Sequence, residues 1–185
     1  MASAVEILFF PNFFDRFNAA VVAETTVAEY TRHVDALMFC LSKGLGAPIG
    51  SLLAGNREFI AEARRLKVLF GGAWRQAGIM AAAGLIALRD GPGRLAEDHA
   101  NARRLAEGVA EIVPGSVDLA SVQTNMVFVD VAGTGWPTVE WMRRLEEAGL
   151  RVTVVAGRVR MLTHADVTAP DVETALAAWR RAAVS

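Results

Sequence analysis

The residue best suited to covalent chemistry in this sequence is Lys43, which follows an apolar run and opens a glycine-rich segment, 43–50. A lysine amine attacks an aldehyde only when it is neutral, and partial burial or neighbouring positive charge lowers its pKa toward that state. Glycines beside it let a flat aromatic cofactor approach the backbone closely. The pattern is typical of a Schiff-base lysine, although a lysine at the end of a strand is more often just a solvated charge.

Two arginines and three histidines are the other side chains with chemical potential. Arg160 lies between two apolar residues in an alternating run, which by itself predicts an outward side chain on a half-exposed strand. Arg75 follows a pair of glycines and could cap their carbonyl groups, bridge subunits or contact a cofactor. The histidines are interpreted as solvated, packing or hydrogen-bonding residues rather than general bases; they are His33, His99 and His164.

Composition narrows the classes of partner. The chain has 185 residues and a formal net charge of −1, with basic residues scattered among acidic ones, so nothing favours nucleic acid or an anionic membrane surface. Cys40 is the only cysteine, which excludes an internal disulfide, offers no metal site and suits a reducing compartment. The apolar start, 7–10, lacks a basic leader and is too short to span a bilayer. We therefore expect a soluble, cytoplasmic protein.

Hydrophobic periodicity defines the elements of the first part of the chain. Residues 1–17 are rich in phenylalanine but show neither helical nor strand period, and they stay unassigned. Two buried strands are expected around the glycine-rich loop, which together make a hairpin. A helix over 57–69 is expected next, capped by Asn56 and stopped by two glycines. The expected elements are a helix at 27–34, strands at 35–41 and 51–54, and helices at 57–69 and 73–88.

A cluster of breaking residues, 90–93, predicts an interruption after the fifth element, followed by a long amphipathic helix at 94–113. Pro114 and Gly115 then open a second module with the alternating pattern of a small α/β layer. Its expected elements are strands at 125–131, 151–155 and 159–162 and helices at 138–148 and 170–183. The sequence thus predicts an α/β fold in two parts.

The segment 41–51 closely resembles the cofactor-lysine segment of low-specificity threonine aldolases, in the aromatic amino-acid β-eliminating lyase superfamily. Other segments resemble the same family in the same order, and together they run from about Phe17 to the C-terminus. One such segment would be modest support, whereas an ordered series is strong. The further segments are 17–20, 71–78, 97–102, 123–128 and 159–164.

The resemblance implies a pyridoxal 5'-phosphate enzyme that cleaves L-threonine and similar β-hydroxy-α-amino acids to glycine and an aldehyde. In fold, it implies the C-terminal part of an aspartate aminotransferase-type large domain, 17–113, and a small C-terminal α/β domain, 114–185, after an unassigned 1–16. By position, Lys43 is the Schiff-base residue, Arg160 binds the substrate carboxylate, and Arg75 lies near the cofactor. Family members are homo-oligomers, dimers or tetramers, with small-molecule substrates.

The sequence departs from the family in three places. The N-terminal half that supplies the phosphate-binding turn and the residue stacked on the cofactor ring is not represented. The segment that carries the ring-nitrogen aspartate and a following arginine is altered, and a two-residue gap assigns these roles to Asp15 and Arg16. In an alignment without this gap, Asn12 and Asp15 would occupy the positions of the family's aspartate and arginine, and both roles would be lost. Trp74 replaces a smaller residue in the glycine-rich turn.

These departures keep two alternatives open. One is a truncated, non-catalytic remnant of a threonine aldolase, produced by a gene rearrangement whose scar is the motif-poor start of the chain. The other is a different pyridoxal-phosphate-dependent β-eliminating lyase, because a cofactor lysine and a carboxylate-binding arginine serve many such enzymes.

Overall fold

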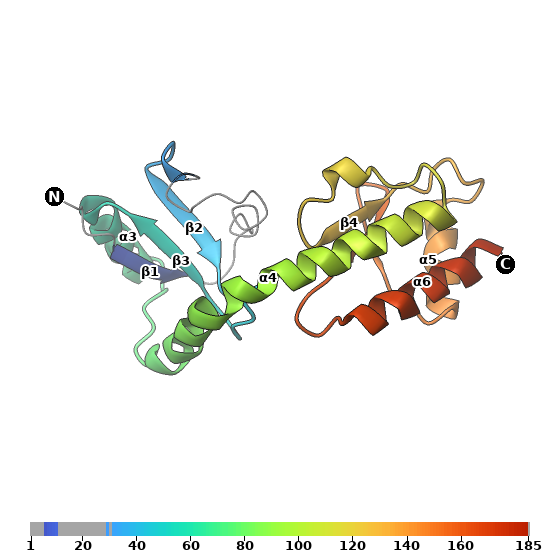
Figure 1. Ribbon diagram of the computed structural model, residues 1–185. Helices are drawn as coiled ribbons and strands as arrows, with labels where there is room; N and C mark the ends of the chain where they lie inside the picture. The colour runs from blue at the N-terminus through green and yellow to red at the C-terminus, as the bar shows by residue number, and fades with distance from the viewer. Residues whose placement is uncertain (1–5, 11–28, 30, 185) are drawn as a thin grey trace. The chain divides into compact units, whose positions relative to one another are not determined.

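The computed structural model of the chain describes residues 6–10, 29 and 31–184 (Figure 1). The chain divides into two compact units, Met1–Leu95 and Ala96–Ser185. The long helix α4, Gly78–Ile112, contributes its first half to one unit and its second half to the other. The domain boundary predicted at 113/114 stays a prediction.

The first unit holds a three-stranded antiparallel sheet in the order β1-β3-β2 (Figure 1). Strands β2, Ala36–Cys40, and β3, Ser51–Gly55, pair across the glycine-rich loop, which confirms the predicted hairpin. Strand β1, Glu6–Phe10, was not predicted, because it lies in the part of the sequence without period. Its pairing with β3 joins residues more than 40 positions apart, so no local signal announces it.

Helix α3, Arg57–Leu69, has the predicted bounds, and the predicted cap is present. The backbone N–H of Phe59 donates to Oδ1 of Asn56 at 2.8 Å, which satisfies one of the amides that a helix start leaves unpaired. The helix buries Ile60 and Ala63, and Leu53 of β3 packs against them. It ends at Leu69 with Phe70 as its C-cap, and the next residue, Gly71, has a φ of +79° that suits glycine.

The break predicted at 90–93 is wrong: α4 is continuous and holds Pro92 in its interior. A proline there removes one helical hydrogen bond and costs about 3 kcal/mol. Packing opposes this cost, because Ala87 and Leu95 on either side of the proline are both buried in one apolar cluster with Leu45. Leu95 reaches that cluster only if the helix continues through the proline. The predicted start at Ala73 is also early, since the helix begins at Gly78.

The second unit contains strands and helices of the kind predicted for the small α/β layer. Its sheet is antiparallel in the order β4-β6-β5, and it shares a core with the second half of α4. The strands are shorter than predicted at both edges of the sheet. The elements are β4 (Met126–Val129), a 3-10 turn (Leu119–Ser121), α5 (Thr138–Glu147), β5 (Thr153–Val155), β6 (Arg158–Leu162) and α6 (Ala169–Val184).

Two buried tryptophans, Trp141 and Trp179, lie at the centre of this core with ring centroids 5.3 Å apart. A buried indole N–H needs an acceptor. Trp141 donates to Oγ1 of Thr134 at 2.7 Å, and Trp179 donates to the sulfur of Met161 at 3.4 Å. Met161 is the neighbour of Arg160, so this packing holds β6 firmly behind the arginine.

Within the described part of the chain, no helix combines the length and apolar character needed to cross a membrane.

An ion-pair network on α5 predicts a pH dependence of stability. Arg143 and Arg144 donate to Oε1 of Glu140 at 2.6 and 2.9 Å, and first the Arg143 and then the Arg144 hydrogen bond lowers the pKa of Glu140 from 4.5 to about 2. A depressed carboxyl pKa stabilises the fold above the unfolded value, and this stabilisation is lost as the pH falls. Glu140→Gln should therefore lower the free energy of unfolding at pH 7, with the difference shrinking between about pH 4.5 and 2.

Urea denaturation at several pH values measures this difference. Glu146→Gln is the matched control, because it makes the same charge change at an exposed position of the same helix. A difference between wild type and Glu140→Gln that stays constant down to pH 2 would contradict the assignment.

Candidate functional site

The loop that carries Lys43 is closed by backbone hydrogen bonds. The N–H of Leu41 donates to the carbonyl of Gly50 at 2.8 Å, and the N–H of Ala47 donates to the carbonyl of Leu41 at 2.9 Å. Gly46 donates to the Lys43 carbonyl at 2.8 Å and has a φ of +75°, a left-handed conformation that favours glycine. Lys43 therefore sits in a defined turn directly after β2, and its side chain is exposed rather than partly buried.

The first half of α4 holds this loop in place through small residues. A Cβ on Gly84 would lie 3.0 Å from Leu41, and one on Gly91 would lie 2.9 Å from the Leu45 side chain and 3.2 Å from its Cα. Leu41 and Leu45 are both buried. The two glycines therefore let the lysine loop approach the helix closely, which explains glycine in a helix interior where it otherwise costs about 1 kcal/mol relative to alanine.

The other site residues predicted for the first part of the chain are less defined. Arg75 is exposed in the turn between α3 and α4. Asp15 and Arg16 lie outside the described residues, as does the family-like segment at 17–20. The cofactor roles of these residues stay predictions.

Arg160 occupies the middle strand of the second sheet, opposite Phe128 of β4 and Thr153 of β5. Its side chain is half-buried, and its Nε is buried without a hydrogen-bond partner among the described residues. A buried N–H without an acceptor is costly, so this position suits a ligand that brings one. Arg160 also lines a cavity of about 620 Å³ within the second unit. Its polar and charged lining residues are Arg151, Thr153, Arg160, Thr163, His164 and Asp171.

The end of β6 just beyond Arg160 is fixed by buried polar contacts. The Thr163 hydroxyl donates to the Asp98 carbonyl of α4 at 2.6 Å. Asn125 donates from Nδ2 to the Thr163 carbonyl at 2.8 Å, and Asn101 donates to the Val167 carbonyl at 3.0 Å. Three separate family-like segments of the sequence, 97–102, 123–128 and 159–164, thus meet at this strand end. Sequence reasoning noted the segments but missed their shared role, which is to position the arginine strand and the cavity wall.

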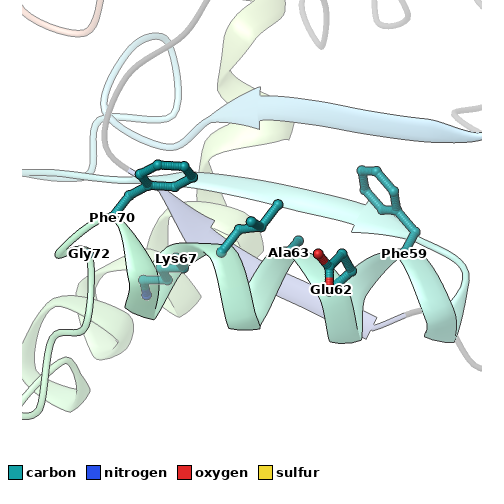
Figure 2. A pocket seen from close by; sticks show the side chains of 7 residues that line it. Phe59, Glu62, Ala63, Lys67, Phe70 and Gly72 are labelled. Carbon is teal, nitrogen blue, oxygen red and sulfur yellow. The ribbon is translucent and has the colours of Figure 1, made fainter.

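Among the described residues of the first unit, cavities lie along α3 and beside the loop that carries Lys43. An apolar groove of about 530 Å³ runs along α3, with Phe59 near one end and Phe70 near the other (Figure 2). It holds none of the predicted site residues. A smaller cavity of about 320 Å³ lies beside the loop that carries Lys43, and Pro48 and Asp90 are among the residues that line it. No group of His, Cys, Asp or Glu side chains among the described residues could hold a metal ion.

The predicted site residues therefore fall into separate units. Lys43 and Arg75 belong to the first unit and Arg160 to the second. Each unit by itself presents a defined element for its residue: a glycine-rich turn for the lysine, and a sheet strand above a cavity for the arginine. Sequence reasoning did not single out Arg151, although its spacing from Thr153 on a predicted strand would place both on one face.

Comparison with known proteins gives a consistent result. The family model described as "Beta-eliminating lyase" matches residues 16–132. A low-specificity L-threonine aldolase of Arabidopsis thaliana is 37% identical over 168 residues, which are 90% of this chain and 47% of the relative. The low specificity L-threonine aldolase of Escherichia coli K12 is 38% identical over 164 residues, which are 89% of this chain and 47% of the relative. The chain spans about half the length of the curated relatives it matches.

Solved structures show the same fold. The chain superposes on a putative L-allo-threonine aldolase from Listeria monocytogenes with a TM-score of 0.68 at 19% identity, covering 90% of this chain and 49% of the other. A serine palmitoyltransferase from Sphingomonas wittichii gives a TM-score of 0.63 at 22% identity, covering 92% of this chain and 44% of the other. The mixed α/β architecture of this chain is thus that of part of these fold-type I enzymes, in line with the predicted α/β fold.

Proposed function

This chain belongs to the beta-eliminating lyase family, and from that membership we propose that it is a threonine-aldolase-type lyase dependent on pyridoxal 5'-phosphate. Its substrates would be β-hydroxy-α-amino acids such as L-threonine and L-allo-threonine, cleaved to glycine and an aldehyde. The observation that carries the proposal is the 37% identity to a curated low-specificity L-threonine aldolase over 90% of this chain.

The described residues around Lys43 suit such a cofactor. The lysine is exposed at the start of a glycine-rich turn, so its amine is accessible to an aldehyde. Nothing lies within 4 Å of the place that a Cβ of Gly46 would occupy, which leaves room for a flat ring beside the backbone. Lys43 would hold the cofactor covalently through Nζ. Arg75 and Asp15 would contribute further cofactor contacts, and Arg16 a contact to the substrate.

When bound, pyridoxal phosphate supplies an electron sink for the pair released as the Cα–Cβ bond breaks. This chain's own contribution is to bind and orient the amino acid. Arg160 would take the α-carboxylate in its planar guanidinium, which can form two parallel hydrogen bonds. Its buried Nε lacks a competing acceptor among the described residues, so the carboxylate would satisfy it. Thr163 and Asn125 keep the strand in place behind the arginine.

We further propose that the protein acts as a homo-oligomer in the cytoplasm, in threonine breakdown and glycine formation. Large apolar side chains exposed on and around α3 and α4 support an oligomer, since Phe70 is 81% and Ile79 74% exposed. The single cysteine, Cys40, is buried and free of disulfides, which suits a reducing compartment.

The test is product analysis with the purified protein, pyridoxal phosphate and L-threonine. Acetaldehyde and glycine in equal amounts are expected, measured by reduction of the aldehyde with alcohol dehydrogenase and by amino-acid analysis. Ammonia and a keto acid would instead identify a β-eliminating lyase. Absence of both product pairs would contradict the proposal and favour the non-catalytic remnant.

A further inference from the structure

The cavity around Arg160 carries more positive charge than one carboxylate requires. Two arginines, Arg151 and Arg160, line it, against a single acid, Asp171. The carboxylate of Asp171 is already engaged at the start of α6, where it accepts the N–H of Thr168 at 2.9 Å and its hydroxyl at 2.5 Å. Asp171 is thus committed to a helix cap and does not neutralise a particular arginine.

Arg151 and Arg160 are placed to act on the same small ligand. Thr153 is the Cα partner of Arg160, and Arg151 precedes it by two residues. Arg151 itself lies just before β5, outside the strand, and it lines the same cavity as Arg160. Among the residues that the structure describes, neither guanidinium forms an ion pair or a side-chain hydrogen bond.

The cavity that the two arginines line also has apolar walls. Leu150, Val152, Val172 and Ala175 line the same cavity. Arg160 is half-buried there and its Nε is buried, so its charge favours an anionic partner, because burial removes water that would otherwise solvate it. Arg151 is exposed beside it on the same cavity. Two cationic side chains on one cavity with apolar walls therefore suit a ligand with an acidic group at each end of a short carbon chain.

We propose that this cavity binds small dicarboxylates, with one carboxylate on Arg160 and the second on Arg151. The inference rests on the proposed function for the identity of the first group, the α-carboxylate of an amino acid. It adds a substrate class: β-hydroxy-α-amino acids whose side chain carries a second carboxylate are preferred over threonine. Arg151 then acts as a specificity residue that leaves the binding of the α-carboxylate unchanged.

The test is a titration of the purified full chain with succinate and with propionate, monitored by calorimetry and by the NMR signals of the arginine Nε–H groups. Wild type should bind succinate about tenfold more tightly than propionate, the ratio that one additional charge-assisted pair supplies. Arg151→Gln should remove this preference and leave propionate binding unchanged. Arg160→Gln should weaken both ligands.

Arg158→Gln is the matched control, because Arg158 is a neighbouring exposed arginine that stacks on Phe128 at 4.8 Å and does not line the cavity. Three results would overturn the inference: equal affinity for succinate and propionate, an unchanged preference in Arg151→Gln, or inorganic phosphate bound as tightly as succinate. Cleavage of threonine by a protein without the dicarboxylate preference would leave the proposed function standing and overturn this inference alone.

Discussion

Lys43→Ala is expected to abolish the absorbance of covalently bound pyridoxal phosphate at about 420 nm, because the ε-amine of this lysine is the proposed attachment point. Lys43→Arg should lose the band as well, since it keeps the positive charge but lacks the nucleophilic amine. The exposed position of Lys43 in a turn means that neither change removes buried packing, so both variants should fold as wild type does. The loss is therefore expected to be complete and specific.

The chain offers a sharp control, because it contains only two lysines, Lys43 and Lys67. Lys67→Ala on α3 should keep the full absorbance. Reduction of the cofactor adduct with borohydride, followed by peptide mass analysis, should place the label on the peptide that contains Lys43. A band that survives in Lys43→Ala, or a label found on Lys67, would show that the lysine is wrongly assigned.

The parts of the fold that sequence reasoning predicted correctly are those with local signals. Helix α3 is bounded by its own capping residue, Asn56, and by a glycine at its end, so its limits follow from neighbouring residues alone. The β2–β3 hairpin is similarly local, with two apolar runs around one glycine-rich loop. In both cases the hydrogen bonds that define the element join residues close in sequence.

The errors arise where distant residues decide the outcome. Pro92 with its flanking glycines is a strong local signal for a break, yet burial of Leu95 beside the lysine loop keeps α4 continuous. Strand β1 forms because its backbone pairs with β3, and no pattern within residues 6–10 indicates this pairing. Local chemistry sets a preference of a few kcal/mol, and packing between distant segments outweighs it.

The same distinction applies to the site. Lys43 and Arg160 were found because they stand in short segments that resemble family motifs. The contacts that hold Arg160 in place were not, since the hydroxyl of Thr163 meets the carbonyl of Asp98 from 65 residues away. Arg151 was not singled out, because the proposed role of this residue rests on the cavity that it shares with Arg160, and a sequence shows no cavity.

Packing of the lysine loop on α4 makes Gly91→Ala the most informative stability variant. A Cβ at this position would lie 2.9 Å from Cδ2 of Leu45 and 3.2 and 3.3 Å from its backbone Cα and O. The Leu45 side chain could rotate away, but its backbone could move only with the loop that carries Lys43. Gly91→Ala should therefore lower the free energy of unfolding by about 1–3 kcal/mol, the usual cost of overpacking.

Gly93→Ala separates this contact from helix propensity, because Gly93 lies in the same helix two residues on and has nothing within 4 Å of its Cβ position. Alanine favours a helix interior over glycine by about 1 kcal/mol, so this variant should be stabilised by up to that amount. Urea denaturation of the two proteins measures the contrast, and cofactor absorbance should weaken only in Gly91→Ala as the loop shifts. Equal stability of the two variants would mean that the loop carrying Lys43 does not pack closely on α4. The interpretation that this packing positions Lys43 would then be wrong.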